Sequence, residues 1–451
     1  MMELLIGTLV TLAVGRYIFK GYSATGVLLS GGLLLLAITA LMGKAVLPAS
    51  VASTGHVATD VFEYVRFLLV DRGGGLGMLI MVLCGFAGYM SHIGANTILV
   101  KLASKPLGII KSPYILLVAA YLVACAMSLA VSSATGLGVL LMATLFPLMV
   151  NMGISRGAAA AVCASPAAII LAPTSGDVVM AAQAANMELI EFAFKLTLPI
   201  SLTAIAAMAV THFFWQRYLD RKSGEHNEAV APSDLITDAP GFYAILPFTP
   251  IIGVLLFDGK LGPKLDIVTI IVICLVLAAL LELMRKRNGR ELLDGLQVCW
   301  RSMADAFAGV VMLLVGAGVF AQGLMGLGFI ANLLDLAQSF GTGGIIIIML
   351  VLVVITTLAA FTTGSGNAPF YAFVELIPHL ATSLGVNPAY LVIPMLQASN
   401  LGRTISPVSG VVVACAGMGN LSPFEVVKRT SMPVAVGLLV VILATQILVP
   451  A

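Results

Sequence analysis

Long, continuous apolar segments make up most of this chain and are separated by short polar interruptions. The segments at 26–42, 267–284, 344–361 and 434–449 are long enough, or nearly so, to cross about 30 Å of hydrocarbon as helices. Strands of a membrane barrel would alternate apolar and polar residues, which these segments do not. Hydrophobic residues make up 60% of the chain and charged residues 10%, so the bilayer must act as its solvent. The pattern predicts an all-α polytopic membrane protein.

The polar interruptions recur as two similar sequences. The hydroxyl- and glycine-rich segment 132–136 corresponds to 362–366, and the Pro-x-Ser-Gly segment 173–176 corresponds to 407–410. The offset between the copies lies between 230 and 234 residues, and small insertions account for the drift. Paired helix-breaking and hydroxyl residues at membrane depth indicate the ion and substrate sites of a secondary transporter.

The duplication divides the chain into two repeats of one plan. Each repeat should contain two spans, an amphipathic stretch, a Gly-rich span, a hairpin, a broken span and a final span. The predicted segments are, in order, repeat one at 1–216, its amphipathic stretch at 60–66, its Gly-rich span at 76–100 and its hairpin at 113–150, a charged linker at 217–241, and repeat two at 242–451, with an amphipathic stretch at 290–302, a Gly-rich span at 304–331 and a hairpin at 344–381. This gives about ten transmembrane helices plus two re-entrant hairpins.

The distribution of basic residues predicts the orientation of the repeats. With the N-terminus outside, and with each hairpin entering and leaving on one side, most Lys and Arg residues fall inside, including the cluster at 285–287. The two repeats are then inverted relative to each other. The first hairpin opens from the cytoplasm and the second from the outer face. We therefore expect a multi-pass protein of a bacterial inner membrane with both termini periplasmic.

The hairpin tips and broken spans carry the candidate binding residues. A helix that stops in the membrane leaves backbone groups that must be packed in protein or must line a watery site. Hydroxyl and amide side chains there offer oxygens to a cation and donors to a carboxylate. The expected substrate-binding residues are Ser132, Ser133, Thr135, Thr363, Ser365, Asn367, Arg403 and Thr404, and the expected coupling-ion or broken-helix residues are Thr174, Ser175, Asp177, Ser406 and Ser409. Packing of small residues between helices is the alternative.

Charged residues at membrane depth are few, and each is expensive there. Arg403 is the candidate for the substrate carboxylate, because guanidinium can bind it through two parallel hydrogen bonds. Asp177 lies at the matching break of the other repeat and either holds a coupling proton or cation or pairs with Arg403 as an internal salt bridge. For Glu375, on a hairpin arm, a packed hydrogen-bonding role is equally plausible. Arg429 is expected near a span end, as an interfacial anchor.

Sequence motifs for enzymes are absent. The chain has no Walker A loop, no His-Glu-x-x-His and no Gly-x-Ser-x-Gly. Its six cysteines form no close pairs and lie mostly in apolar segments, so we expect neither disulfides nor a metal site. We predict a transporter without a cofactor or a nucleic-acid partner. A channel and an intramembrane enzyme are the alternatives from other classes, although no convincing nucleophile–base pair is present.

Several long sequence blocks resemble one known family. They are Gly21-Tyr-Ser-Ala-Thr-Gly26, the block 130–141 around Ser132–Gly136, Ala172-Pro-Thr-Ser-Gly-Asp177, the block 363–373 beginning Thr-Gly-Ser-Gly-Asn, and Gln397-Ala-Ser-Asn-Leu-Gly-Arg403. Over nearly its whole length the chain resembles the DcuC family of anaerobic C4-dicarboxylate carriers, which is placed in a wider ion-transporter superfamily. Divalent-anion members of that superfamily carry Ser-Asn-Thr at both hairpin tips. The tips here, Ser133-Ala-Thr135 and Ser365-Gly-Asn367, depart from that triplet, which puts sodium coordination in question.

The resemblance implies a mechanism and a quaternary structure. It implies a homodimer in which an elevator-like transport domain moves past a static scaffold. The scaffold parts would be 2–72 and 242–302, and the transport parts 76–216 and 304–451. It also implies succinate, fumarate, malate or aspartate as substrates, moved by exchange, proton-linked uptake or efflux. Another organic or inorganic anion, coupled to sodium or protons, is the alternative within transporters.

Overall fold

The computed structural model describes residues 2–20, 22–48, 51–223, 237–257, 262–329 and 344–450, and in these ranges every regular element is a helix. Seven helices are long and apolar enough to cross a membrane, or eight if a bent pair counts as one span. Shorter apolar helices lie at Leu5–Ile18, Pro113–Met127 and Gly241–Leu256. The all-helical, multi-pass prediction is therefore confirmed, while the number of ten spans stays a prediction.

The first half of the chain contains two long helices, a bent pair and a series of shorter helices. Its elements are α1 (Met2–Phe19), α2 (Ala24–Leu41), α3 (Val57–Gly74), α4 (Leu76–His92), α5 (Ala95–Ser104), η1 (Lys105–Ile109), α6 (Pro113–Met127), α7 (Ala134–Asn151), α8 (Arg156–Ala164), η2 (Pro166–Ala168), α9 (Gly176–Ala184), η3 (Glu191–Thr197) and α10 (Leu198–Ser223).

The second half follows a similar order. Its elements are η4 (Gly241–Phe248), α11 (Thr249–Leu256), α12 (Ile267–Lys286), α13 (Gly289–Ala306), η5 (Phe307–Val311), α14 (Met312–Leu327), α16 (Gly344–Thr363), α17 (Asn367–Val374), α18 (Ile377–Leu384), α19 (Pro388–Thr404), α20 (Gly410–Met418) and α21 (Pro423–Leu448). Residues 224–236 of the predicted linker, and the end of the predicted span 304–331, lie outside the described residues.

Left-handed backbone turns recur in the same order in both halves. Gly94, with φ +78°, ends α4, and Gly328, with φ +89°, ends α14 at the equivalent position. The left-handed conformation ends a helix abruptly, and it is adopted mainly by Gly and sometimes by Asn. The equivalent pairs are Gly43 and Arg287, Gly94 and Gly328, Gly153 and Gly385, and Asn186 and Asn420. These turns follow the order that the predicted duplication expects, and the duplication itself stays a prediction.

The two halves differ in how the amphipathic stretch joins the following span. In the first half, α3 and α4 bend by 44° at Gly75. In the second half, α13, η5 and α14 form one helix of 39 residues, Gly289–Leu327, with a π-helical turn at 307–311. The separate segments expected at 290–302 and 304–331 are therefore continuous. The Gly-rich span expected at 76–100 is instead interrupted between His92 and Ala95.

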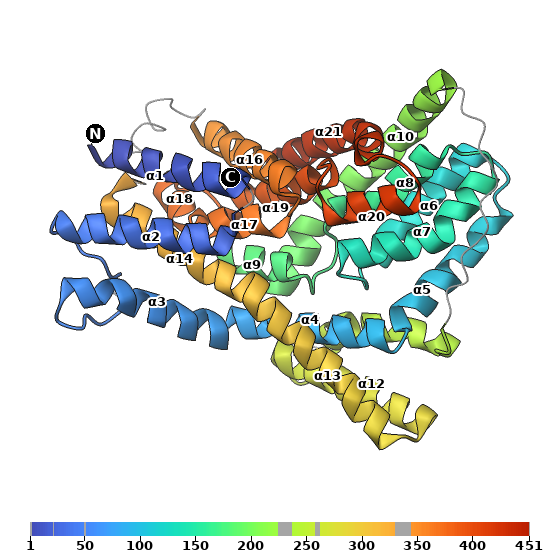
Figure 1. Cartoon of the computed structure of the whole chain (residues 1–451), viewed down its shortest axis with the longest axis horizontal. Coiled ribbons are helices and arrows are strands. Elements are labelled where there is room, and N and C mark those ends of the chain that lie inside the picture. Colours follow the sequence, from blue (N-terminus) through green and yellow to red (C-terminus); the bar gives the residue numbers. More distant parts are fainter. Residues whose placement is uncertain are drawn as a thin grey trace.

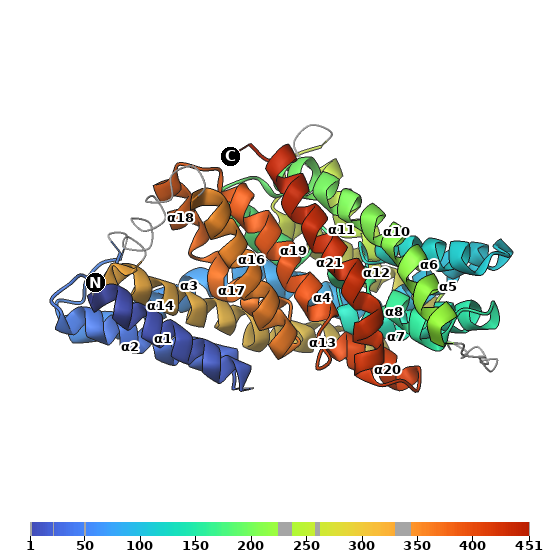
Figure 2. The same ribbon diagram turned by 90° about the horizontal axis from the view of Figure 1, so that it is seen from above.

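Close helix packing defines two groups of helices on either side of the centre. In Figures 1 and 2, α1, α2 and α14 lie together at the end that carries the N-terminus, and α5 to α8 and α10 lie at the opposite end. Gly32 permits the close approach of α2 to α14, since a Cβ there would lie 2.5 Å from the backbone nitrogen of Phe320. The helices α16, α17, α19 and α21 lie between the two groups (Figure 2).

Candidate functional site

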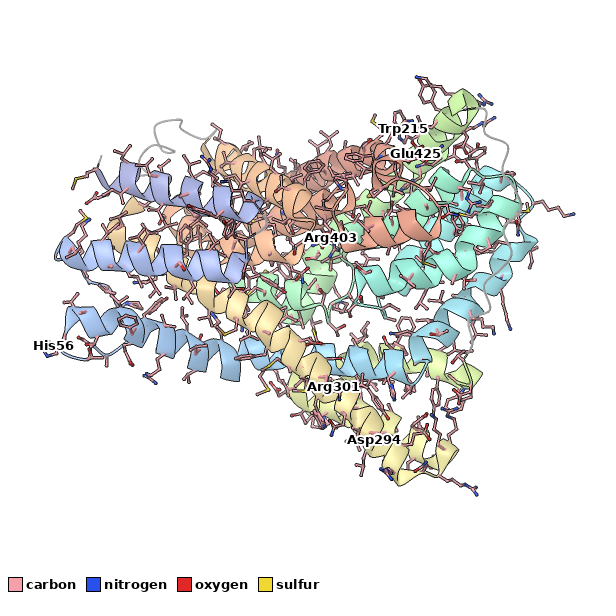
Figure 3. The ribbon with its side chains drawn as sticks, viewed as in Figure 1. His56, Trp215, Asp294, Arg301, Arg403 and Glu425 are labelled. Carbon is pink, nitrogen blue, oxygen red and sulfur yellow. The ribbon has the colours of Figure 1, made fainter. Side chains whose placement is uncertain are left out.

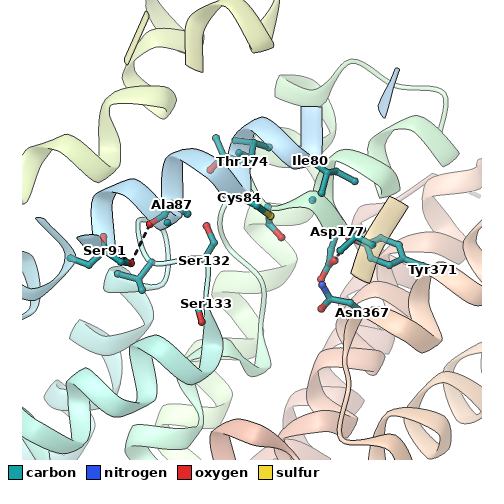
Figure 4. Close-up of a pocket in the computed structure, with 17 residues that line it drawn as sticks. Ile80, Cys84, Ala87, Ser91, Ser132, Ser133, Thr174, Asp177, Asn367 and Tyr371 are labelled. Atoms are coloured by element: carbon teal, nitrogen blue, oxygen red, sulfur yellow. Dashed lines mark hydrogen bonds between the residues drawn. The ribbon is translucent and has the colours of Figure 1, made fainter. Parts of the chain in front are cut away.

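A polar cavity of about 320 Å³ lies where the hairpins and broken spans meet. Such a volume falls at the lower end of the range of about 300–1,000 Å³ that is usual for small-molecule sites. Its lining residues are Ile80, Leu83, Cys84, Ala87, Gly88, Ser91, Asn96, Val131, Ser132, Ser133, Thr174, Ser175, Gly176, Asp177, Val310, Asn367 and Tyr371. Figure 4 shows Ser132 and Ser133 on one side, and Asp177, Asn367 and Tyr371 on the other.

The tip of the first hairpin contributes two hydroxyl groups. The helix α6 ends at Met127, and α7 begins at Ala134 after a turn. Ser133 is the N-cap of α7, and its Oγ accepts a hydrogen bond of 3.1 Å from the backbone N–H of Gly136. Ser132 and Ser133 both line the cavity. Thr135 does not line it, and its Oγ1 lies next to Gly410 of the other repeat instead, 3.1 Å from where a Cβ would be.

The first broken span contributes a hydroxyl pair and the acid. It consists of α8, the 3₁₀ turn η2 and the short helix α9, which begins at Gly176. Thr174, Ser175 and Asp177 line the cavity in the gap. Ser175 is the N-cap of α9 but makes no side-chain capping bond. The first N–H groups of α9 therefore lack the partner that a capping serine usually supplies.

The second hairpin contributes Asn367 and Tyr371 from α17. Its turn is tight because Gly364, with φ +71°, packs against the backbone of Ser409. Thr363 and Ser365 are not among the lining residues. The Thr363 hydroxyl donates to Ala359 O at 2.7 Å, and Ser365 Oγ accepts from the N–H of Ala368 at 3.2 Å. These two side chains close the turn and do not face the cavity.

The second broken span lies behind the cavity. Arg403 is central in the molecule (Figure 3), and its Nη2 donates to Ala167 O at 3.0 Å. Thr404 donates to Asn400 O at 3.0 Å, and Ser406 Oγ accepts from the N–H of Val408 at 3.4 Å. Ser409 Oγ is buried without a hydrogen-bond partner in the described part of the chain. None of these four residues lines the cavity, and Arg403 instead lies beside Gly366 at the second hairpin tip.

Asp177 is the acidic residue among those that line the cavity. Its side chain is 3% exposed, and its Oδ1 accepts a hydrogen bond of 2.6 Å from the Tyr371 hydroxyl. Arg403 and Asp177 attract each other electrostatically, although Arg403 gives a hydrogen bond to Ala167. The Nε atom of Arg403 and the Oδ1 atom of Asn400, both next to the second tip, are buried and have no partner among the described residues. A carboxylate and a guanidinium thus both lie near the second hairpin, Asp177 bonded to Tyr371 of α17 and Arg403 next to Gly366.

Sequence reasoning missed four polar lining residues, namely Cys84, Ser91, Asn96 and Tyr371. Asn96 Nδ2 donates to Ser91 Oγ at 2.7 Å, while Asn96 Oδ1 is buried with no partner in the described residues. The sequence did contain an indication of the role of Asn96. This amide lies two residues after Gly94 in an apolar segment, which is typical of a helix that is interrupted within the membrane. Tyr371 lies inside the sequence block 363–373, but its role depends on its hydrogen bond to Asp177, which only the folded chain brings close.

The two repeats are not equivalent at this cavity. The positions that correspond to Tyr371 and Asp177 in the other copy are Leu141 and Val411. Both are apolar and buried, on α7 and α20, two helices that also contact each other. Only one of the two equivalent helix pairs therefore carries a phenol and a carboxylate, and this pair forms the polar wall.

A second buried polar cluster surrounds Arg429, which is 1% exposed. Its Nη1 donates to Asp220 at 2.6 Å and its Nε to Glu425 at 2.9 Å. Asp220 also accepts from the Ser155 hydroxyl at 2.5 Å. Arg429 lies near the start of α21, as expected, but its side chain is buried and joins α21 to α10 and α8. In the described ranges no group of three or more His, Cys, Asp or Glu side chains is arranged to bind a metal ion.

Comparison with known proteins gives a family for the chain. Residues 2–450 match the family model for the C4-dicarboxylate anaerobic carrier, DcuC. The chain is 70% identical over 448 residues to the anaerobic C4-dicarboxylate transporter DcuC of Escherichia coli K12, covering 99% of this chain and 97% of that one. It is 62% identical over 453 residues to the probable anaerobic C4-dicarboxylate transporter DcuC of Vibrio cholerae, covering 100% and 98%.

Two solved transporters share the fold. The YdaH transporter of Alcanivorax borkumensis superposes with a TM-score of 0.65 at 18% identity, covering 94% of this chain and 97% of that one. MtrF of Neisseria gonorrhoeae, described as an antimetabolite efflux pump, superposes with a TM-score of 0.58 at 13% identity, covering 94% of both chains. At these identities the likeness concerns the arrangement of helices alone.

Proposed function

The chain belongs to the DcuC family of C4-dicarboxylate anaerobic carriers, and we propose that it is itself a secondary carrier of C4-dicarboxylates in a bacterial inner membrane. The observation that supports this most is the polar cavity between the first hairpin tip, the first broken span and α17. It is small, central and lined by hydroxyl and amide groups in an otherwise apolar helical protein. The preferred substrates are succinate, fumarate, malate and aspartate.

Helix N-termini and neutral donors bind the two carboxylates in this proposal. The helices α7, α9 and α17 all begin at the cavity, at Ala134, Gly176 and Asn367. The N-terminus of a helix carries partial positive charge and unpaired N–H groups, so it attracts anions. The start of α9 is the most available, because Ser175 leaves it without a side-chain cap. Ser132 and Ser133 across the cavity then bind the second carboxylate.

Arg403 supplies compensating positive charge from behind the second hairpin tip. Its Nε has no partner in the described part of the chain, and it lies next to Gly366, whose lack of a side chain keeps the backbone close to the guanidinium. A small movement of the tip would bring Arg403 to the substrate. We therefore propose that Arg403 binds a carboxylate only when the tip has moved into its substrate-bound position. Thr363, Ser365 and Thr404 would contribute to binding in that same position.

The charge of Asp177 requires a coupling cation. A dicarboxylate within roughly 5 Å of an ionised Asp177 would be repelled by about 3 kcal/mol for each carboxylate at an effective dielectric constant near 20. We propose that a proton on Asp177 accompanies the substrate and removes this repulsion. Sodium held by Thr174, Ser175 and Asp177 is the alternative, although the hairpin tips lack the Ser-Asn-Thr triplet.

Alternating access is proposed to use the two repeats in inverted orientation. The recurrence of four left-handed turns supports the repeat, and the distribution of basic residues supports the inversion. The hairpins and broken spans would move as one transport domain past the scaffold parts 2–72 and 242–302 of a homodimer. Both termini would then face the periplasm.

Counterflow in proteoliposomes tests the proposed function. Vesicles loaded with unlabelled succinate should take up labelled succinate faster than empty vesicles, and loading with butyrate should give no acceleration. Ser133→Ala and Ser175→Ala, each made alone, should weaken succinate binding roughly 10- to 100-fold. This is the effect of losing one hydrogen bond to a charged group. Thr382→Ala, which removes an exposed hydroxyl on α18, is the matched control.

The same assay separates the alternatives. Uptake that is indifferent to internal dicarboxylate would contradict a carrier and favour a channel. Acceleration by an internal anion other than a C4-dicarboxylate, with none by succinate, would assign another substrate. Imposing pH and sodium gradients one at a time identifies the coupling ion.

A further inference from the structure

A second, apolar crevice of about 560 Å³ lies between the N-terminal helices and the second hairpin. One wall comes from α1, α2 and α14 and the other from α16 and α17. The lining residues are Thr11, Leu12, Val14, Gly15, Arg16, Ile18, Lys20, Ala24, Leu28, Phe320, Ile355, Leu358, Ala359, Thr363, Ala368, Pro369, Ala372 and Phe373. Almost all of this surface is hydrocarbon, unlike the substrate cavity, with which the crevice shares no residue.

Two cations stand at one end of the crevice. Arg16 lies in the last turn of α1, and Lys20 directly follows that helix, with its backbone N–H bonded to Arg16 O at 3.1 Å. Both are exposed, and neither forms an ion pair with an acidic side chain in the described residues. Tyr17 and Tyr22, 48% and 59% exposed, stack edge to face beside them with ring centroids 5.3 Å apart. Exposed tyrosines together with basic residues are typical of the membrane–water boundary.

The crevice has the depth of one leaflet. From Lys20 to Thr11 the helix rises nine residues, about 14 Å at 1.5 Å per residue, which is roughly half of a 30 Å hydrocarbon core. Along α1 the crevice is therefore about as long as one leaflet is thick, and it also reaches Thr363 and Ala368 at the second hairpin tip. An apolar space open to the membrane at this depth suits an acyl chain, since water would gain few hydrogen bonds there.

We propose that the crevice binds an anionic phospholipid, with one acyl chain between α1 and the α16–α17 hairpin and the headgroup phosphate on Arg16 and Lys20. The two cations select an anionic headgroup, because basic residues at a membrane surface attract such lipids. The apolar walls bury the chain. In this proposal the lipid fills the crevice between the N-terminal helices and the hairpin and does not touch the substrate cavity.

The ligand and the role of each wall can be tested by native mass spectrometry of the full chain. Protein extracted from bilayers of equal phosphatidylglycerol and phosphatidylcholine should retain phosphatidylglycerol in preference. The double variant Arg16→Ala with Lys20→Ala should bind it about 30-fold more weakly, as expected for the loss of two cations near the headgroup. Replacement of two exposed lysines of the α5–η1 segment, Lys101→Ala with Lys105→Ala, is the matched control and should retain the lipid.

Filling the crevice gives a second and independent variant. A Cβ at Gly15 would meet no atom within 4 Å, so Gly15→Leu can occupy the crevice without a steric clash at the Cβ. We expect it to lose the bound lipid while its thermal unfolding stays that of the unmodified protein. Gly417→Leu, on the exposed face of α20 and equally free of neighbours, controls for the added side chain.

Several outcomes would overturn the proposal. They are equal retention of the two lipids, undiminished phosphatidylglycerol in the Arg16/Lys20 variant, and undiminished lipid in Gly15→Leu. Cross-links through α1 to a second copy in the absence of retained lipid would show that another chain covers the crevice. None of these measurements depends on transport, so their failure is distinguishable from failure of the proposed carrier function.

Discussion

At the scale of single residues, the site combines two features that the sequence separates by almost 200 positions. Asp177 lies in the first turn of a short helix in the first half of the chain, and Tyr371 belongs to the predicted hairpin of the second half. A buried carboxylate in a cavity proposed for a dianion makes sense only if its charge is neutralised during part of the cycle. The hydrogen bond from Tyr371 leaves Oδ1 occupied, so Oδ2 is the atom that would carry the proton.

Asp177→Asn should separate exchange from coupling. Asparagine keeps an oxygen that can accept the Tyr371 hydrogen bond, but it cannot ionise. We expect succinate exchange within about 3-fold of the unmodified rate and the loss of uptake driven by an imposed pH gradient, since no proton would be carried. Labelled succinate uptake in proteoliposomes measures both. The control is Asp305→Asn, which replaces an exposed acid in the last turn of α13 and should preserve the pH-driven uptake. If pH-driven uptake is unchanged in Asp177→Asn, the coupling proton is carried by another residue.

The sequence could nominate these residues only in part. Ser132, Ser133, Thr174, Ser175, Asp177 and Asn367 line the cavity as expected, because helix breaks with hydroxyls mark where backbone and side chains meet a polar space. Arg403 was nominated by its charge, and its position behind the second tip depends on a contact to Ala167, 236 residues away in sequence. Asn96 and Tyr371 owe their roles to neighbours that only the folded chain supplies.

At the scale of elements, one ion pair joins the first amphipathic helix to the second hairpin. Arg72 on α3 donates to Glu375, at the end of α17, with 2.8 Å between Nη2 and Oε2. The two side chains are 21% and 14% exposed, and the Arg72 Nε and Glu375 Oε1 atoms are buried without a partner in the described residues. Glu375 thus has the packed, hydrogen-bonding role that the sequence analysis gave as one of its two possible roles. The pair also bridges the proposed scaffold and transport domains.

Breaking this pair should destabilise the protein, and exchanging the charges should restore it in part. Glu375→Gln leaves Arg72 with the longer contact to Asp71, 3.4 Å, as its remaining ion pair in the described residues. We expect this to lower stability by about 1–3 kcal/mol, less than for a fully buried pair because both side chains are partly exposed. The double variant Arg72→Glu with Glu375→Arg should recover part of this loss. Thermal unfolding in detergent measures the effect.

The exposed pair Lys195–Glu191 provides the control for that experiment. Its side chains are 72% and 47% exposed, so Glu191→Gln should change the unfolding temperature little. If Glu375→Gln behaves like Glu191→Gln, the contact between α3 and α17 contributes nothing to the stability of this conformation.

The boundaries of the elements were predictable wherever a local residue ends a helix. Proline, glycine and serine located the gaps before α9 and α20, and the turn before α7. The continuity of α13 with α14 was not predictable, because the π-helical turn at 307–311 has no residue pattern of its own. The bend at Gly75 in the equivalent place comes at the end of a run of three glycines, Gly73–Gly75.

At the scale of the whole molecule, the two halves follow a similar order of elements, and only one of the two corresponding helix pairs is polar. The backbone turns recur, while Tyr371 and Asp177 are replaced by Leu141 and Val411 in the other copy. The cavity is therefore built from both repeats but is not symmetric. In this conformation Ser133 of the first tip faces the cavity and Ser365 of the second does not.

This asymmetry predicts which tip is labelled when the carrier faces each side. In a background with Cys84 replaced by serine, since Cys84 lines the cavity, single cysteines at positions 133 and 365 should react with a membrane-impermeant maleimide in opposite conformations. Dicarboxylate should protect the cysteine at 133, because the substrate would occupy the space beside it. A cysteine at Thr382, on the exposed surface of α18, should react independently of substrate. Reaction of positions 133 and 365 from both faces at once would mean a continuous polar path, which a channel has and a carrier with alternating access does not.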